Sequence, residues 1–242
     1  MTGTFLEILL SKLPLSFILV PIIKKKIILA ITDKETNAQI KAAKVDVVEL
    51  RVDLFRKLAP VYVRDQVLHR RKLKLPLLLT IRNQKKEGAA KDWSIEQKTK
   101  IFEAVLPFVD MVDIELSSPI LKAIITSARK LNKVIIVSMH NFDHTPAHLE
   151  NIFKKALSTR ADIIKISAKA NSLDDVFHMI EFTRRHRRHP LITLCMGPIG
   201  MISRLILPAM GSLYTYSFLS KPTAPGQIDV KTLNSHLKFY YP

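Results

Sequence analysis

The stretch Val47-Val48-Glu49-Leu50-Arg51-Val52-Asp53 decides the fold. Its apolar and charged residues alternate, so in a β-strand Glu49, Arg51 and Asp53 share one face, and the other face is aliphatic. In a barrel, helices cover the outer face of each strand, so the aliphatic face points outward and the charged face points inward. The stretch therefore predicts a strand of a parallel barrel with charged residues facing the interior.

Seven more short β-rich runs occur along the chain, and longer amphipathic patterns separate them. Strands that alternate with helical patterns of about 10–15 residues are typical of βα units and a parallel sheet. No glycine-rich dinucleotide fingerprint follows the first run, so eight units favour a (β/α)8 TIM barrel over a doubly wound open sheet. We predict one barrel domain over residues 26–242. The predicted strands are Ile27–Ile31, Val47–Val52, Leu77–Ile81, Met111–Leu116, Val134–Met139, Ile163–Ser167, Leu191–Cys195 and Leu213–Phe218, and the helical patterns include Glu96–Val105, Pro119–Leu131, Ala147–Leu157, Leu173–Arg185 and Ile202–Leu207.

The composition is that of an ordinary globular protein. The chain has 242 residues, of which 48% are hydrophobic and 24% are charged, and this excludes a disordered or fibrous protein. Cys195 is the only cysteine, so an intramolecular disulfide and a CxxC metal site are excluded. This cysteine usage favours a reducing compartment, and we expect a cytoplasmic protein.

The charge balance is strongly basic, with 38 Lys and Arg against 21 Asp and Glu and a formal net charge of +17. Such a surface attracts polyanions, including nucleic acid, acidic membranes and anionic metabolites. The basic runs are scattered and lack interleaved aromatic residues, however, so we favour a solvated basic surface without a specific nucleic-acid partner. The main runs are Lys24–Lys26, Arg70–Lys72 and Arg184–Arg188.

Residues 1–25 form an apolar extension before the predicted barrel. The segment Phe5–Ile23 is interrupted by two charged residues and two prolines, and its longest run without a charge, Leu13–Ile23, is too short to cross a bilayer. It also lacks a small-residue cleavage site of the secretory kind. We expect an extra strand pair or helix packed on the barrel, and no membrane partner.

Lys165 is the sharpest functional signal, because it interrupts the apolar strand Ile163–Ser167. A buried ammonium is costly unless it is paired or deprotonated. Burial lowers the pKa of a lysine, and the neutral amine can form a Schiff base with a ketone. The alternative is a structural lysine neutralised by a carboxylate of a neighbouring strand, with Glu49, Asp113 and Glu115 as the candidates.

Other polar residues follow the strand ends, where TIM-barrel active sites lie. His140 ends the strand next to that of Lys165 and suits proton transfer, although a strand-end histidine is often structural. The stretch Gly197–Arg204 offers two glycines, a serine opening a helix and an arginine, which together predict a site for a carboxylate or a phosphate. The Pro- and Gly-bounded stretch Lys221–Gln227 has the character of a lid.

Together these motifs closely resemble type I 3-dehydroquinate dehydratase, from about Lys26 to the C-terminus and in the right order. The residues that carry the resemblance are Glu49–Asp53, Thr80–Arg82 with Glu87-Gly88, Asp113–Leu116, Ser138–Phe142 with Thr145-Pro146, Asp162–Ile166, Met196-Gly197 through Ser203-Arg204, Gly211-Ser212 and Ala224–Gln227.

The resemblance implies a shikimate-pathway lyase, without cofactor or metal, that converts 3-dehydroquinate to 3-dehydroshikimate and water. Lys165 matches the family's Schiff-base lysine, His140 its general base and acid, and Glu87 the carboxylate that orients this histidine. Arg204 matches the clamp for the substrate carboxylate. Family members are typically homodimers. The expected substrate contacts are Glu49, Arg51, Arg82, Thr223 and Gln227, with Tyr216 as an aromatic wall.

Some features depart from the family pattern. Ala89 stands where a second glycine is commoner, and Thr223 replaces a frequent serine but keeps the hydroxyl. The apolar extension and the basic surface are not family features. We assign the charge to solubility and to steering of the anionic substrate toward the barrel mouth.

Two rival functions stay open at this point. The first is another Schiff-base barrel lyase of the aldolase kind, which would need a phosphate site. The second is a basic nucleic-acid-binding protein on an inherited barrel, which the net charge would support.

Overall fold

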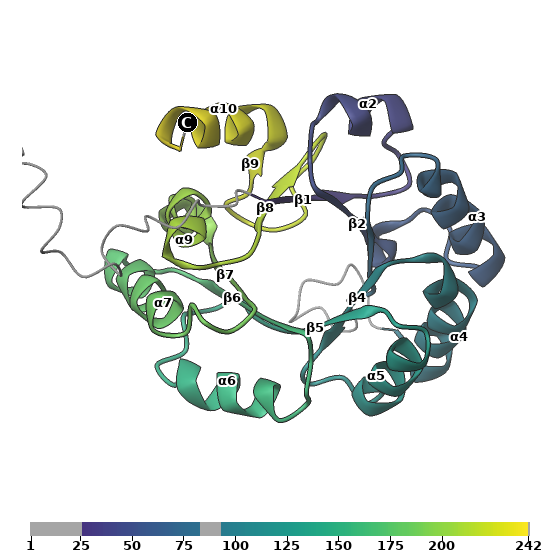
Figure 1. Cartoon of the computed structure of the whole chain (residues 1–242), viewed down its shortest axis with the longest axis horizontal. Coiled ribbons are helices and arrows are strands. Elements are labelled where there is room, and N and C mark those ends of the chain that lie inside the picture. The colour runs from purple at the N-terminus through teal and green to yellow at the C-terminus, as the bar shows by residue number, and fades with distance from the viewer. Residues whose placement is uncertain (1–25, 83–92, 242) are drawn as a thin grey trace, which may run out of the picture.

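The computed structural model describes residues 26–82 and 93–241. Within them, nine parallel strands form one curled sheet in the order β7-β6-β5-β4-β3-β2-β1-β8-β9. Figure 1 shows this sheet curling around a central space, with the helices on the outside. The strands are β1 (Ile27–Ile31), β2 (Val47–Arg51), β3 (Leu77–Thr80), β4 (Met111–Glu115), β5 (Val134–Asn141), β6 (Ile163–Lys169), β7 (Leu191–Met196), β8 (Thr215–Phe218) and β9 (Ile228–Asp229).

Helices connect successive strands and pack on the outer face of the sheet. Each of the five helical patterns predicted from sequence overlaps a helix, and Leu173–Arg185 coincides with α7. The helices are α2 (Asn37–Ala42), α3 (Pro60–Arg71), α4 (Ile95–Val105), α5 (Leu121–Lys130), α6 (Leu149–Leu157), α7 (Leu173–Arg185), α8 (Gly197–Gly200), α9 (Ser203–Met210) and α10 (Val230–Tyr240), with 3-10 turns η2 (Val52–Leu54) and η4 (Leu106–Phe108).

The structure confirms the predicted TIM barrel, with one local difference at its seam. Strands β7 and β8 are joined there by a loop and not by a ladder: Leu213 N donates to Leu191 O (2.8 Å), and Thr193 N donates to Ser212 Oγ (3.1 Å). Ser212 Oγ thus accepts the hydrogen bond from Thr193 N that a backbone carbonyl of a neighbouring strand would otherwise accept. Strand β8 accordingly begins at Thr215, two residues after the predicted start.

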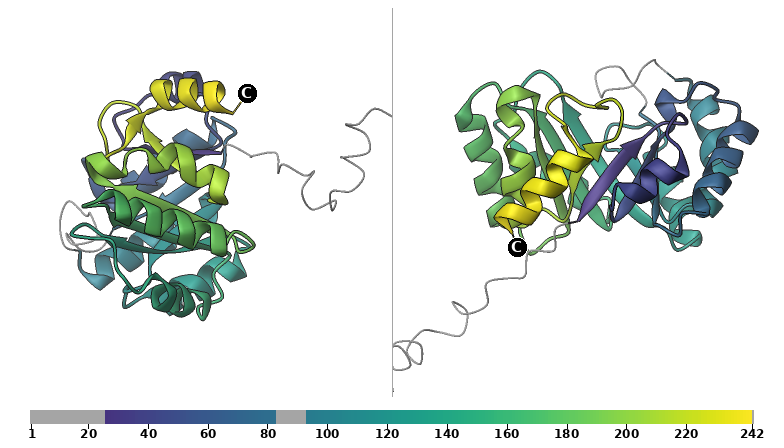
Figure 2. Two further views of the ribbon diagram at one scale, coloured as in Figure 1. Left: turned by 90° about the vertical axis from the view of Figure 1, so that its left-hand side faces the viewer. Right: turned by 90° about the horizontal axis from the view of Figure 1, so that it is seen from above.

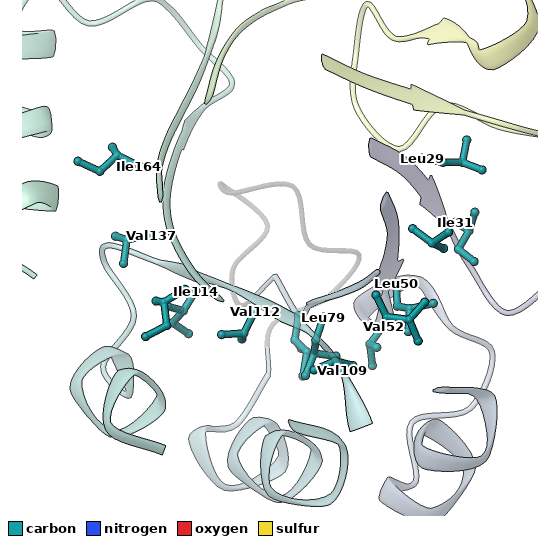
Figure 3. Packing of buried hydrophobic residues seen from close by; sticks show 14 of the residues in the cluster. Leu29, Ile31, Leu50, Val52, Leu79, Val109, Val112, Ile114, Val137 and Ile164 are labelled. Atoms are coloured by element: carbon teal, nitrogen blue, oxygen red, sulfur yellow. The ribbon is translucent and has the colours of Figure 1, made fainter. Parts of the chain in front are cut away.

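Two apolar layers hold the barrel together. The larger one lies between the sheet and the helices, where residues such as Leu50, Leu79 and Val137 point outward (Figure 3). The smaller one fills the barrel interior at the end where the strands begin, with Ile28 and Leu78 among its members. This inner layer blocks that end of the barrel, so polar residues in the interior lie toward the other end.

Local sequence signals explain where several helices begin. Thr36, Ser94 and Ser172 each accept a bond from the backbone N–H three residues on, and the residue at that position bonds back to the cap. These reciprocal bonds satisfy N–H groups that a helix start leaves without intrahelical partners.

Within residues 26–82 and 93–241, no helix is both long and apolar enough to span a membrane. The extension predicted over residues 1–25 lies outside those ranges, so its predicted structure and the domain boundary at residue 26 stay predictions.

Candidate active site

In several strands the inward-facing residues change from apolar to polar along the strand. In β2 they run Val47, Glu49, Arg51, and in β6 they run Ile163, Lys165, Ser167. The parallel register places these changes at similar heights, since Arg51 pairs with Thr80 and Ser138 pairs with Lys165. The polar side chains therefore meet inside the barrel at the carboxyl ends of the strands, where TIM-barrel active sites lie.

Lys165 is buried at the centre of this polar region. Its Nζ donates to the hydroxyl of Tyr216 (3.0 Å) and to Asp113 Oδ2 (3.2 Å), and it lies 3.8 Å from Glu49 Oε1. Burial lowers the pKa of Lys165, although the charges of Asp113 and Glu49 oppose that shift. Two of the carboxylates weighed from sequence do contact the amine. The third, Glu115, binds Lys98 Nζ instead, at 2.7 Å.

Arg82 and Asp113 form a bidentate ion pair beside the lysine. The guanidinium donates to both carboxylate oxygens, at 2.6 and 2.8 Å, and Ser138 Oγ donates to the same carboxylate at 2.6 Å. Burial disfavours ionisation of Asp113, but the charges of Arg82 and Lys165 outweigh it and hold the pKa of this carboxyl well below its usual range. Asp113 is thus a fixed negative charge next to the amine.

His140 lies on β5 next to Lys165, since Ser138 and Lys165 are register partners and His140 is two residues further along the same face. Burial, together with the positive charges of Arg82 and Lys165, lowers the pKa of His140 well below 6.5. The imidazole is therefore neutral at pH 7, which is the form that accepts a proton.

Arg204 reaches the same region from α9 on the other side of the barrel. Its Nε donates to Gly226 O (2.6 Å) and its Nη1 donates to Tyr216 O (3.3 Å). The side chain is buried with no carboxylate partner among the described residues, and burial lowers its pKa to about 10. A buried cation held by backbone carbonyls is a good partner for an anionic ligand.

The glycines before Arg204 have a different role from the anion site predicted from sequence. A side chain at Gly200 would lie 2.7 Å from the backbone of Cys195, so this glycine allows close helix–strand packing. Ser203 Oγ is buried and accepts a bond from Cys195 N (3.0 Å), so it does not face a ligand. In this segment it is the side chain of Arg204 that reaches the polar interior of the barrel.

The loop after β8 is tied to the cleft by its own hydrogen bonds. Gln227 Oε1 accepts from Thr223 N (2.6 Å), and Thr223 O accepts from Arg51 Nη1 (3.3 Å). Arg51 also forms a buried ion pair with Asp53 at 2.7 Å. Gly226 has φ +72° and lies so close to Gly197 that a side chain there would clash with the backbone. This loop therefore forms one wall of the cleft.

These side chains line one open cleft of about 420 Å³, a volume that includes solvent at its mouth. Nine of the ten side chains proposed from sequence line it. Glu87 lies outside the described residues, so its expected contact with His140 stays a prediction. The nine are Glu49, Arg51, Arg82, His140, Lys165, Arg204, Tyr216, Thr223 and Gln227.

Sequence reasoning missed some members of the site. It treated Asp113 only as a possible structural partner of the lysine and gave Ser138 no role, although both bind Arg82. The alternation Met111, Asp113, Glu115 on one strand face was the signal for Asp113. Phe142 and Met196 also line the cleft, and nothing in their local pattern indicates this.

Fold and site together define a class of protein: a TIM-barrel enzyme with a buried amine, a neutral imidazole and a buried arginine around one small cleft. The chain belongs to the type I 3-dehydroquinase family, whose family model matches residues 27–242. This membership confirms the resemblance found in the motifs.

Individual relatives agree with this assignment. The chain is 37% identical over 217 residues to 3-dehydroquinate dehydratase of Thermodesulfovibrio yellowstonii, covering 88% of this chain and 90% of that protein. Its identity to the Methanocella arvoryzae enzyme of the same name is 34%, covering 88% of this chain and 95% of that one. The crystal structure of 3-dehydroquinate dehydratase from Geobacillus kaustophilus has a TM-score of 0.81 and 27% identity, covering 90% of this chain and 93% of that one. The chain is thus a 3-dehydroquinate dehydratase, a lyase of the shikimate pathway.

Proposed function

We propose that the dehydration proceeds through a Schiff base on Lys165, and that the substrate is held in the cleft by Arg204. The observation that carries this proposal is the position of Lys165: a buried amine with a lowered pKa, in the same cleft as the neutral imidazole of His140. A desolvated lysine is the usual nucleophile toward a ketone in covalent catalysis.

The first step joins the Lys165 amine to the carbon of the substrate ketone, and the ketone oxygen leaves as water. The resulting iminium withdraws electrons and acidifies the C–H bond on the neighbouring carbon. His140 takes that proton, and the electron pair of the C–H bond moves to form an enamine. The charges of Arg82 and Asp113 lie close to this centre and fix its local electrostatics.

The second half of the reaction expels the hydroxyl group and releases the enzyme. The enamine electrons form the new C=C bond as the hydroxyl departs, and His140 returns its proton so that water leaves. Water then hydrolyses the iminium, which frees the conjugated ketone product and the Lys165 amine. Arg204 binds the substrate carboxylate throughout, because its buried charge has no carboxylate partner among the described residues. Glu87, which lies outside those residues, is proposed to orient His140.

The remaining contacts are assigned by their place on the cleft wall. Glu49, Arg51, Thr223 and Gln227 supply donors and acceptors for the substrate hydroxyl groups, and Tyr216 forms the wall against the lysine. A relative supports covalent chemistry in this kind of site: the type I 3-dehydroquinate dehydratase of Clostridium difficile was crystallised "with Covalent Modified Comenic Acid", at 29% identity and a TM-score of 0.81.

Replacing Lys165 by methionine tests the proposal. Absorbance of the conjugated product should show that Lys165→Met loses essentially all turnover of 3-dehydroquinate, because no amine is left to form the iminium. Lys169→Met, four residues further along the same strand and outside the cleft lining, is the matched control and should keep near-wild-type kcat. Turnover by Lys165→Met at a similar rate would refute the covalent route.

The family resemblance also leads us to propose a homodimer and a cytoplasmic location. Sedimentation of the purified chain checks the first, and fractionation of the source cells checks the second.

A further inference from the structure

The excess positive charge lies mainly at the end of the barrel opposite the cleft. We call this end the basal face: it consists of the connections that lead into strands and the helix turns just before them. These connections carry eight basic residues against three acidic ones. The basic ones are Lys26, Lys44, Lys72, Lys74, Lys133, Arg160, Arg187 and Arg188, and the acidic ones are Asp46, Asp110 and Asp162.

The three basal aspartates are already engaged in the fold. Each accepts a bond from a strand N–H: Asp46 from Ile27, Asp110 from Leu77 and Asp162 from Ile135, at 2.7–2.8 Å. Among the described residues, Asp110 alone of the three also pairs with a basal cation, Arg71. The acidic residues therefore cap strand starts and leave most of the basic charge of this face uncompensated.

The last turns of the helices add further cations to the same end. They hold Lys41, Arg70, Arg71, Arg129, Lys130, Lys154, Lys155, Arg184, Arg185 and Lys238. Of these, Arg70 is buried against Asn37 and the carbonyl of Glu35, and Arg184 and Arg185 pair with Glu181 and Glu150. The helix dipole favours cations at helix ends and explains part of this set. It does not explain why Lys44, Lys74 and Arg160 occupy left-handed backbone positions (φ 50–58°), where glycine is preferred.

The mouth of the barrel has no comparable excess. In the described part of the chain, the connections that leave the strands carry Lys34, Arg56, Lys57, Arg82 and Lys221 against Asp33, Glu35, Asp53 and Asp143. The sequence analysis expected basic charge around the mouth, where it would steer the anionic substrate. In the described ranges, most of the excess basic charge lies at the basal face instead. The basic charge needs another explanation.

Exposed apolar side chains lie among the basal cations. Leu131, Leu213 and Leu157 are 38–44% exposed and sit at three separate basal segments. Helix α10 ends at this end of the barrel (Figure 2), and its last residues Phe239 and Tyr240 are 78% and 58% exposed. A ring of cations interspersed with exposed apolar groups is typical of a surface that contacts the interface of a membrane.

The sequence that precedes β1 is also rich in apolar residues. Residues 1–25 are mostly apolar and end in Lys24 and Lys25, and the chain enters the barrel at Lys26 on the basal face. Lys26 is fixed there, because its carbonyl accepts a bond from Thr215 N (2.9 Å). Binding to a membrane surface strengthens with apolar area and with attraction to anionic lipids, and the sequence offers both an apolar segment and basic residues.

We propose that the basal face binds the surface of a membrane that contains anionic lipids, with the active-site cleft facing the solution. This revises the sequence-based expectation of no membrane partner. A lipid surface is favoured over nucleic acid because most of the exposed apolar residues are aliphatic and offer no flat ring for a base to stack on. The cations also surround a whole end of the barrel, which a planar surface can contact at once.

Vesicle sedimentation of the full chain tests this proposal. At about 0.15 M salt, the protein should bind vesicles of phosphatidylcholine with about 30% phosphatidylglycerol and not vesicles of phosphatidylcholine alone. The basal variant Lys72→Ala/Lys130→Ala/Arg187→Ala/Arg188→Ala should bind at least about tenfold more weakly, because each cation near an anionic surface contributes to affinity. Replacing Phe239 and Tyr240 by serine should also weaken binding.

The matched control removes four exposed lysines from the other end of the barrel: Lys34→Ala/Lys57→Ala/Lys122→Ala/Lys231→Ala. It has the same net charge as the basal variant and should bind vesicles like the wild type. Both variants should keep wild-type kcat in solution. Equal vesicle affinity of the two variants would overturn the proposal, as would binding that ignores lipid charge. Tighter binding of a mixed-sequence RNA than of anionic vesicles at the same salt would also overturn it and favour nucleic acid.

Discussion

Burial and neighbouring carboxylates have opposite effects on the pKa of Lys165, which determines how much of the amine is neutral and reactive. Burial favours the neutral amine, whereas Asp113 and Glu49 favour the ammonium, and the outcome is a pKa below the usual value. Tyr216 has a raised pKa because it is buried near Glu49 and Asp113, so its hydroxyl stays protonated beside the amine. This setting gives Lys165 a larger neutral fraction at a given pH than a solvated lysine has.

His140 should determine the acidic side of the pH–rate profile. Its pKa is lowered, so the imidazole stays neutral as the pH falls through 6.5 and becomes protonated only at more acidic pH. The acidic limb of kcat/KM, which reports the free enzyme, should therefore have its midpoint below pH 6.5. A limb near neutrality, as expected from an unperturbed histidine, would contradict this assignment.

Replacement of the same residue checks the role itself. His140→Gln should lower kcat by about 10²–10⁴-fold, as is typical for loss of general acid–base catalysis, with a smaller change in KM. Steady-state kinetics of the folded variant measure this, and a near-normal kcat would move the role to another group.

Arg204 should be irreplaceable by lysine. Its Nε and Nη1 bind backbone carbonyls, and this fixes the plane of the guanidinium that faces the cleft. An ammonium cannot reproduce that planar fork. Arg204→Lys should therefore lose kcat/KM by an amount equivalent to about 2–5 kcal/mol, the usual effect of removing one partner of a buried charge pair.

The control for Arg204 is Arg56→Lys, since Arg56 pairs with Asp33 outside the cleft lining. It should keep wild-type kcat/KM. Near-wild-type kcat/KM in Arg204→Lys would show that the substrate carboxylate binds elsewhere.

Among single residues, site residues could be predicted from sequence where a charged side chain stands in an otherwise apolar strand. A lysine in an aliphatic strand and charges on alternate positions of β2 are visible without a structure, and both lie in the cleft. The serine that seals the barrel seam and the true role of Gly200 were not predictable, because each depends on a contact with a residue distant in space.

Among the helices and strands, α4 and β4 are joined by a buried ion pair. Lys98 on α4 binds Glu115 on β4 at 2.7 Å, and both side chains are almost completely buried. Glu115 Oε1 also lies 4.0 Å from Arg82 Nη1, so the pair is continuous with the charges around Lys165. The Lys98–Glu115 ion pair therefore connects helix α4 of the outer layer to the charged residues of the cleft.

Removing one partner of the Lys98–Glu115 ion pair should lower the stability of the protein. Lys98→Met leaves Glu115 buried without its ammonium, and the free energy of unfolding should fall by about 3–5 kcal/mol. Lys98→Met/Glu115→Leu should recover most of that loss, because an apolar pair replaces the buried ions. Denaturant unfolding measures both, and a single variant as stable as the wild type would contradict the assigned role of the pair.

The strands were the most predictable elements, because all eight predicted runs are short, rich in apolar residues and contain β-branched residues. Among the helices, those named from sequence were found, whereas α2, α3 and α10 were not among them. Helix α3 carries charged residues around much of its surface, so its helical period is weak. The two-residue strand β9 is too short to leave a periodic signal.

At the scale of the whole molecule, the two ends of the barrel have separate roles. The inner apolar layer closes the basal end, and the charges that enter the reaction lie at the other. The net charge of +17 was visible in composition, but its placement was not, since it depends on which loops lie at which end. With most of that excess on the basal face, long-range steering of substrate should be weak, because charges beyond about 10 Å are screened at 0.1 M salt.

The covalent intermediate on Lys165 is the central claim, and borohydride trapping tests it most directly. Borohydride reduces a C=N bond to a stable secondary amine, so treatment during turnover of 3-dehydroquinate should inactivate the enzyme. Mass mapping of peptides should then place the added substrate-derived mass on Lys165, in the wild type and in Lys169→Met but not in Lys165→Met. Label on a different lysine, or full activity after borohydride with substrate, would contradict the account.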